Sequence, residues 1–351
     1  MTKITTHLRR QNITLSWRRY GIDALNGMAM GLFGSLIVGL ILKNIGTWAN
    51  ISALITAGTH AQMAVGGAIG VGVAFGLKAP PLVLFSAVAT GLAGAELGGV
   101  VGALIASIIG TECGKLIHKT TPIDIIITPA VALLAGIGTA YAIAPSIAAL
   151  MMALGSFIVW AMALSPILTS IIIAITMGLL LTLPISSAAI AISLDLSGVA
   201  AGAATVGCAA QMVGFALMSY RDNQAHLPNG GLHGIIAQGL GTSMLQMPNI
   251  IKNPKIWLPP TLTGAILAPF ATAVFGMTNI AIGAGMGTSG LVGQIGTLDA
   301  MGFSVRTVVL IVLFHLILPA ILTLIFAKIM HKKGWIKDGD LTLPDLKINN
   351  Q

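Results

Sequence analysis

Residues 229–249 read NGGLHGIIAQGLGTSMLQMPN, a polar and glycine-rich stretch in a chain that is otherwise strongly apolar. Its five glycines weaken helix formation. Irregular, polar backbone is stable at membrane depth only where protein or a water-filled cavity covers it, because exposed amide groups in hydrocarbon cost several kcal/mol each. The stretch therefore predicts a binding site and not a lipid-facing helix.

The composition places this stretch in a membrane protein. Of the 351 residues, 56% are hydrophobic and 8% charged, with a mean hydropathy of +0.94, whereas soluble domains have roughly 25% charged residues. The net charge of +8 could indicate nucleic-acid binding. The cations, however, flank apolar segments, as the positive-inside rule expects of cytoplasmic loops. We therefore expect a multi-pass protein of a cell membrane without direct nucleic-acid contact.

Apolar runs and basic flanks predict the topology. We expect an all-α membrane protein with about 8–10 transmembrane helices plus re-entrant or discontinuous segments. Basic residues near both ends place both termini in the cytoplasm. The expected organisation is a basic N-terminal segment over 1–20, a membrane domain over 21–333 and a cytoplasmic tail over 334–351.

Breaks within the apolar runs predict where helices are interrupted. Residues 51–76 contain the run GGAIGVGVAFG and are a poor helix by propensity, so they are interpreted as a re-entrant or discontinuous segment. Residues 283–297, GAGMGTSGLVGQIGT, form a second segment of this kind. Pro145 and Pro166 are expected to separate consecutive helices.

Polar side chains in these segments are the candidate solute ligands. His233 and Gln238 are expected to face similarly, about one turn apart. Each candidate also has a structural alternative: polar side chains often join membrane helices, and Glu96 could pair with Lys78. Cys113 and Cys208 lack metal spacing and are expected to pack as small apolar residues. The full set of candidate substrate-binding residues is His233, Gln238, Thr288, Ser289, Gln294, Glu96, His60 and Gln62.

Three runs carry a family resemblance: NGGLHGIIAQGLGTSMLQMPNIIKNP (229–254), PPTLTGAILAP (259–269) and GMGTSGLVGQIG (285–296). They resemble the phosphotransferase-system enzyme IIC-like membrane proteins of the perfringolysin regulator type. The resemblance implies a homodimer with a scaffold part and a substrate part built around re-entrant hairpins. The Gly-Ile-Thr-Glu signature of glucose-type enzyme IIC is absent, as are a IIB domain and its phosphorylatable cysteine motif, which argues against coupled sugar phosphorylation.

The leading functional hypothesis is a permease of the enzyme IIC type for a small polar solute, either a sugar or a small organic acid. It would work by alternating access, with polar side chains on broken helices replacing the water shell of the solute. The alternative is a membrane sensor, derived from a transporter, that regulates gene expression. An enzyme is less favoured because no nucleophile–base pair or metal-ligand set stands out, and no cofactor is expected.

Overall fold

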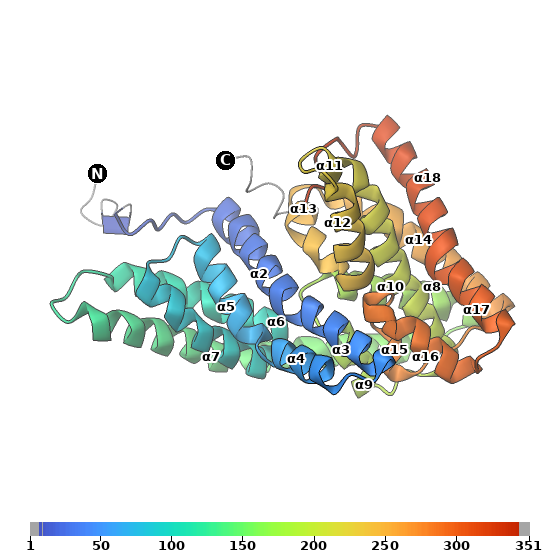
Figure 1. The fold of residues 1–351 in the computed structure, drawn as a ribbon, viewed down its shortest axis with the longest axis horizontal. Coiled ribbons are helices and arrows are strands. Elements are labelled where there is room, and N and C mark those ends of the chain that lie inside the picture. The colour runs from blue at the N-terminus through green and yellow to red at the C-terminus, as the bar shows by residue number, and fades with distance from the viewer. Residues whose placement is uncertain (1–6, 9, 344–351) are drawn as a thin grey trace. The chain divides into compact units, whose positions relative to one another are not determined.

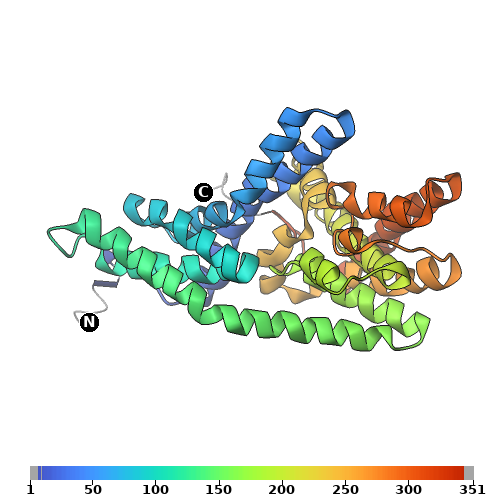
Figure 2. The same ribbon diagram turned by 90° about the horizontal axis from the view of Figure 1, so that it is seen from below.

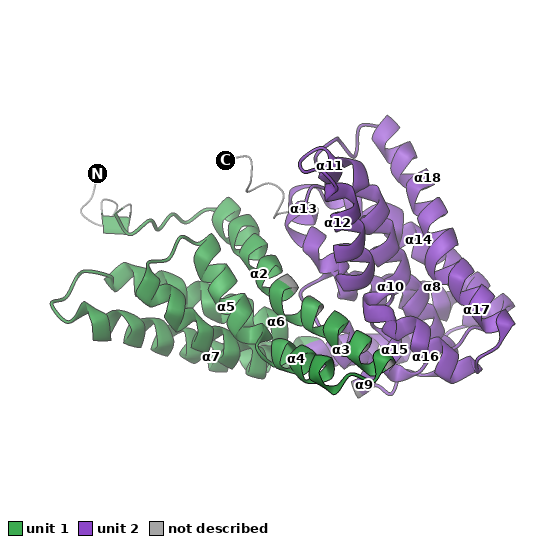
Figure 3. Ribbon diagram, in the orientation of Figure 1, with its two compact units in different colours: residues 1–150 green, residues 151–351 purple. Residues whose placement is uncertain are grey.

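The computed structural model describes residues 7–8 and 10–343, and this part of the chain is helical, with one isolated β-bridge between Gly198 and Asn279 and no strand. The predicted all-α class is confirmed. The chain divides into two compact units, residues 1–150 and 151–351 (Figure 3), which are described separately below. The expected organisation by residues 1–20, 21–333 and 334–351 remains a prediction, and its outermost residues lie outside the described part.

Six helices within the described residues are long and apolar enough to cross a membrane. Two shorter apolar helices, Val65–Gly76 and Pro166–Thr182, accompany them. The expected number of crossings stays a prediction. The candidate spans are Arg19–Thr47, Pro81–Ile117, Asp124–Met162, Gly198–Met218, Pro254–Val274 and Val305–Lys332.

Unit 1 consists of helices joined by short connections (Figure 1). Its elements are the π-helical turn η1 (Arg19–Asp23), α2 (Ala24–Leu32), the π-helical turn η2 (Phe33–Ile37), α3 (Val38–Ala49), α4 (Ser52–Met63), α5 (Val65–Gly76), α6 (Pro81–Ile117) and α7 (Asp124–Met162), the last of which continues into unit 2.

Glycines let neighbouring helices of unit 1 approach to backbone contact. Gly31 lies against Ala68, and Gly46 against Ile55, so the first helical arm and the 52–76 arm run antiparallel. Figure 1 shows α2 and α5 side by side. The 52–76 arm is interrupted at Ala64, between α4 and α5. The discontinuity expected for residues 51–76 is therefore confirmed.

The 37-residue helix α6 is a hairpin and not one straight span. Gly98 and Gly99 have non-helical backbone angles, and Gly99 has a φ of 58°, which favours glycine. Gly94 lies against Gly102, and Gly114 against Val83. The two arms on either side of the glycine pair are therefore antiparallel. Pro81–Ile117 is therefore a helical hairpin with its turn at Gly98 and Gly99.

The expected separation of helices at Pro145 is wrong. The helix α7 runs through Pro129 and Pro145 without a break (Figure 2). A proline inside a helix removes one hydrogen bond, and neighbouring groups in a membrane protein can satisfy the freed carbonyl. Pro166 acts as predicted, since it is the first residue of the next helix.

A buried ionic cluster attaches the N-terminal segment to unit 1. Arg19 Nε donates to Glu112 Oε1 at 3.0 Å, and Lys115 Nζ lies 3.3 Å from Glu112 Oε2. Lys115, only 1% exposed, also donates to the carbonyls of Asn12 at 2.7 Å and Leu77 at 3.0 Å. The ammonium N–H groups of Lys115 thus bond within the protein, so this cluster stabilises the fold.

Unit 2 surrounds one central helix. Its elements are α8 (Pro166–Thr182), α9 (Ser187–Ser193), α10 (Gly198–Met218), α11 (Tyr220–Gln224), α12 (Gly230–Ile236), η3 (Ala237–Gly241), η4 (Ser243–Gln246), α13 (Met247–Lys252), η5 (Pro254–Trp257), α14 (Leu258–Pro269), η6 (Phe270–Val274), α15 (Ala281–Ala284), η7 (Ser289–Leu291), α16 (Val292–Met301), α17 (Val305–Ile311), η8 (Val312–Ile317) and α18 (Leu318–Lys332).

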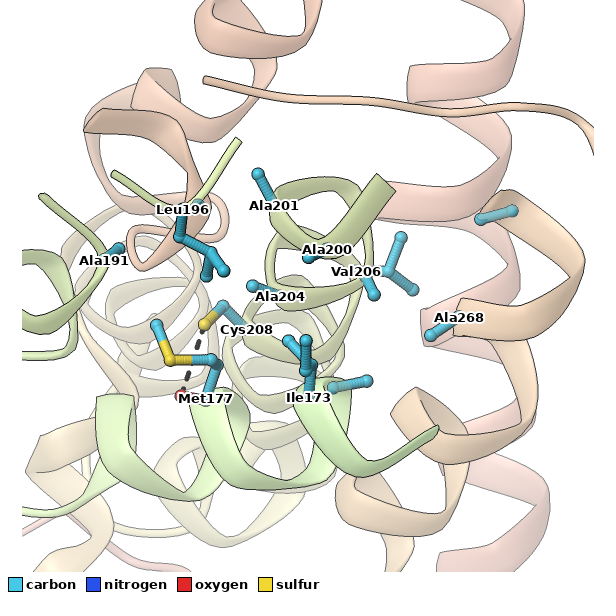
Figure 4. Packing of buried hydrophobic residues seen from close by; sticks show 14 of the residues in the cluster. Ile173, Met177, Ala191, Leu196, Ala200, Ala201, Ala204, Val206, Cys208 and Ala268 are labelled. Carbon is cyan, nitrogen blue, oxygen red and sulfur yellow. Dashed lines mark hydrogen bonds between the residues drawn. The ribbon is translucent and has the colours of Figure 1, made fainter. Parts of the chain in front are cut away.

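The central helix is α10, against which α8, α14 and α18 pack. Its small residues permit this arrangement, because side chains without bulk let backbones come together. Gly207 lies against Ala174 of α8, and Gly202 against Met277. Figure 4 shows the apolar core around the helix, where the Cys208 thiol donates to the Met177 carbonyl at 3.4 Å. Cys208 is fully buried in this core.

The described part of the C-terminal tail packs on unit 2. Leu341, Thr342 and Leu343 are buried. The Leu343 amide donates to Asn223 Oδ1 at 2.9 Å, and the Leu341 amide donates to Asp222 Oδ2 at 2.9 Å. Residues 335–343 therefore form a strap across the region that follows α10.

Candidate functional site

Two irregular segments of unit 2 form the candidate site, and both coincide with the glycine-rich runs of the sequence. Residues 229–252 pass from α12 through the π-helical turn η3 and the 3-10 turn η4 into α13. Residues 281–301 form α15, the short turn η7 and α16. The predicted loss of regular helix in both runs is confirmed.

The second segment contains backbone that only tertiary contacts can hold. Gly287 and Gly290 have φ values of 53° and 50°, and Leu291, which carries a side chain, has a φ of 60°. A left-handed conformation costs a residue with a side chain roughly 1–2 kcal/mol. Gly287 lies against the backbone of Cys208 in α10. The loop is thus fixed in a strained form beside the central helix.

Asn279 organises the second segment. Its side-chain nitrogen donates to Thr205 Oγ1 at 2.6 Å and to the Gly293 carbonyl at 2.9 Å, and its side-chain oxygen accepts the Ile280 amide at 2.7 Å. Its backbone pairs with Gly198. Asn279 therefore attaches this segment to α10 at two places, at Thr205 within the helix and at Gly198 where the helix begins.

A hydrogen bond joins the two segments directly. Thr288 Oγ1 donates to the carbonyl of Gly239 at 2.5 Å. Thr288 is 1% and Ser289 6% exposed, and both lie in the turn before α16. Residues that are distant in sequence, in the 229–249 and 283–297 runs, thus come together. Whether they bind a solute remains a prediction.

Gln238 is fully buried and its amide is saturated by protein groups. Its nitrogen donates to Ser219 Oγ at 2.7 Å and to the Gly234 carbonyl at 3.1 Å, while its oxygen accepts from Gln246 at 2.8 Å. Gln246 donates in turn to the carbonyl of Leu341 at 2.9 Å. Gln238 thus belongs to a network that connects the first segment to the C-terminal strap.

His233 and Gln238 do not share a face, contrary to the expectation from the sequence. His233 is exposed, whereas Gln238 is buried. Five positions along a helix correspond to well over one turn, and the π-helical turn η3 begins between the two residues. His233 therefore lies on a different surface from the buried cluster.

Gln294 is paired with a histidine that the sequence analysis did not select. Its side-chain nitrogen lies 3.2 Å from His315 Nδ1, and the two residues are 7% and 1% exposed. The sequence does hold a signal for His315, because it is the one titratable residue between Arg306 and Lys328 of the last apolar run. An ionisable residue within such a run is a functional candidate by default.

The remaining candidates lie in unit 1 and not in this cluster. Glu96 is exposed and stands just before the turn of the α6 hairpin. His60, exposed, and Gln62, half-buried, lie near the end of α4. The alternative of an ion pair between Glu96 and Lys78 finds no such contact in the described residues.

Beside its apolar core, the interior of unit 2 holds polar side chains without Asp, Glu, Lys or Arg among the described residues. Its buried polar side chains, over the described residues, are those of Ser, Thr, Asn and Gln together with His315, and none is Asp, Glu, Lys or Arg. No group of three or more His, Cys, Asp or Glu side chains in the described part of the chain could hold a metal ion. The available chemistry is hydrogen bonding by neutral groups.

The model of one protein family, described as phosphotransferase system, EIIC, matches residues 22–343. The chain belongs to the EIIC family. It is a multi-pass membrane protein of that family, which implies a transporter-type function. The resemblance stated from the sequence is confirmed at this level. Searches of curated proteins and of solved structures gave no match.

Proposed function

We propose that this EIIC-family protein is a permease for a small, neutral, hydroxyl-rich solute of the sugar or polyol class, moved by alternating access without coupled phosphorylation. Unit 2 is the substrate part and unit 1 the scaffold. The observation that carries the proposal is the set of uncharged polar side chains in the interior of unit 2. The irregular backbone at Gly287–Leu291 supports it, since broken helices commonly carry transporter binding sites.

The same observation favours one of the two solute classes that the sequence left open, the sugars, over the small organic acids. Each hydrogen bond to a neutral hydroxyl contributes about 0.5–1.5 kcal/mol. Burying a carboxylate costs several kcal/mol unless a cation pairs with it, and a helix N-terminus returns at most about 2 kcal/mol. The buried cations Arg19 and Lys115 belong to unit 1, where Glu112 and backbone carbonyls occupy them. An organic acid would therefore lack a partner.

We keep a homodimer in the proposal because the family resemblance implies one. The small-residue faces of the first half, which also suggested a dimer, are used within the chain: Gly31 packs on Ala68, and Gly70 on Ala87. Exposed apolar side chains such as Phe85 and Leu134 supply the surface that faces lipid or a second copy.

The test compares neutral and anionic solutes with the same skeleton. Purified protein in mild detergent is heated with glucose or glucuronate, and with sorbitol or gluconate, and proteoliposomes are assayed for uptake of the same compounds. We expect a neutral compound to raise the melting temperature and to be transported, while its acid does neither. Acids that bind as well as their neutral counterparts would refute the neutral class. Binding without uptake would favour the sensor alternative.

A further inference from the structure

The pair formed by Gln294 and His315 has hydrogen-bonding capacity that the protein does not use. Gln294 Nε2 and His315 Nδ1 are 3.2 Å apart. The other amide atom of Gln294, Oε1, is buried and has no hydrogen-bond partner in the described residues. The other ring nitrogen of His315 has no hydrogen bond there either. A buried polar atom without a partner is costly, so this arrangement calls for a further group.

One of the two unused atoms donates and the other accepts a hydrogen bond, whichever way the Gln294 amide and the His315 tautomer are assigned. If Gln294 donates to Nδ1, then Gln294 Oε1 remains as an acceptor and His315 Nε2–H as a donor. If the amide is turned over, Nδ1–H donates to Oε1, and the pair leaves an amide donor and a ring acceptor. At least one donor and one acceptor remain in both cases, one on the amide and the other on the ring. The two nitrogens of an imidazole point in divergent directions, so Gln294 Oε1 and His315 Nε2 take separate groups. Hydroxyl groups fit both positions because each can donate or accept, whereas a carboxylate only accepts and an ammonium only donates.

The local backbone places His315 on an irregular turn. It lies in the π-helical turn η8, and Pro319 follows in the first turn of α18. Proline has no N–H with which to bond the carbonyl four residues earlier, here that of His315, and its ring clashes with that carbonyl. A wide π-helical turn relieves the clash, and such turns are frequent at functional sites. Gln294 lies in the first turn of α16, directly after the strained Gly287–Leu291 loop.

We propose that Gln294 and His315 form a subsite that binds two hydroxyl groups of the transported solute, one at each unused atom. This inference rests on the proposed function and adds His315 to the solute ligands. It also gives the subsite its selectivity, because a solute that lacks the hydroxyl bound by Gln294 leaves the buried amide atom without a partner.

The experiment measures affinity from ligand-induced thermal stabilisation of the full-length protein. The probes are D-glucose, D-galactose, D-mannose, D-ribose and mannitol, followed by the monodeoxy analogues of whichever sugar stabilises the wild type. We expect Gln294→Leu and His315→Asn each to weaken binding about tenfold. Asparagine can still bond Gln294 from the position of Nδ1 but has no atom at the position of Nε2. Loss of affinity in His315→Asn therefore indicates direct contact, and wild-type affinity would overturn it.

Thr323→Val is the matched control. Thr323 is buried on the same final helix run and donates to Thr263 Oγ1 at 3.1 Å. This variant loses a buried hydroxyl away from the pair, and its affinity should equal that of the wild type. If Gln294→Leu fails to fold, Gln294→Asn replaces it in the experiment. Its side chain keeps the amide but is one methylene shorter, so we expect the same loss of affinity.

The deoxy analogues identify the hydroxyl that Gln294 binds. One deoxy sugar should bind wild type about tenfold more weakly than the parent sugar, and this difference should vanish in Gln294→Leu, since the two changes remove the same contact. Additive losses would overturn the subsite, as would variants that bind every probe like the wild type, which would mean that the pair holds only water. Stabilisation of the wild type by none of the neutral probes would instead refute the proposed function, and the subsite with it.

Discussion

The two units of this protein both use glycines for close helix packing, but they differ in how many polar side chains they bury. In unit 1, glycines bring neighbouring helices into backbone contact, as where Gly70 meets Ala87, and 28% of the residues in the apolar window of α6 are buried. In unit 2, 94% of the corresponding window of α10 is buried, and amides and hydroxyls lie around it. Close packing therefore holds unit 1, and unit 2 adds to such packing a set of interior hydrogen bonds that a solute could exchange.

The largest effect should come from filling a glycine contact in unit 1. A Cβ at Gly70 would overlap the Ala87 carbonyl oxygen, so we expect Gly70→Ala to destabilise the fold by roughly 3 kcal/mol, near the upper end for overpacking. Gly138→Ala is the control, because Gly138 has nothing within 4 Å of an added Cβ; it should be neutral or gain up to about 1 kcal/mol. Thermal unfolding in mild detergent measures both. Equal stability of the two variants would mean that unit 1 does not depend on glycine packing.

An effect of intermediate size on stability is expected from replacing glutamine with leucine, and this substitution should be costly in unit 2 but not in unit 1. Gln238→Leu removes one hydrogen bond from Ser219 and one from Gln246, and we expect a loss of about 2 kcal/mol. Gln62 of unit 1 is half-buried and its side chain makes no hydrogen bond in the described residues, so Gln62→Leu should change stability by less than about 0.5 kcal/mol. Equilibrium unfolding of both variants tests this. If Gln62→Leu proved the more damaging of the two, the contrast between the units would be wrong.

The smallest effect on stability is expected for His233, whose side chain is exposed. His233→Ala should change the free energy of unfolding by less than about 0.5 kcal/mol. If His233 binds the solute, the substitution should weaken binding by roughly 0.5–1.5 kcal/mol, through loss of one hydrogen bond. Ligand-induced stabilisation of wild type and variant, across sugars and organic acids, distinguishes the two roles. Equal shifts with every effective ligand would remove His233 from the site and direct attention to Glu96 and His60.

Much of the candidate site was visible in the sequence because its signals are local. Glycine clusters at 229–249 and 283–297 weaken the helix wherever they occur, and the structure is irregular in both places. The prediction at Pro145 failed because the outcome there does not depend on local sequence alone. Proline weakens a helix, but the surrounding protein decides whether the helix continues. His233 and Gln238 were grouped by sequence distance, and the π-helical turn that separates their faces was not foreseeable from spacing alone.

The sequence by itself determined the membrane class, the helical class, the family and the glycine-rich runs in which helices break, since each follows from composition or from neighbouring residues. Only the tertiary structure decided which polar atoms are satisfied. Gln238 finds its partners in Ser219 and Gln246, and Gln246 bonds the strap at Leu341. Gln294 meets His315 from another helix and keeps one amide atom unpaired. These partners are far apart along the chain, and a buried polar group is satisfied or left open by the helices that pack around it.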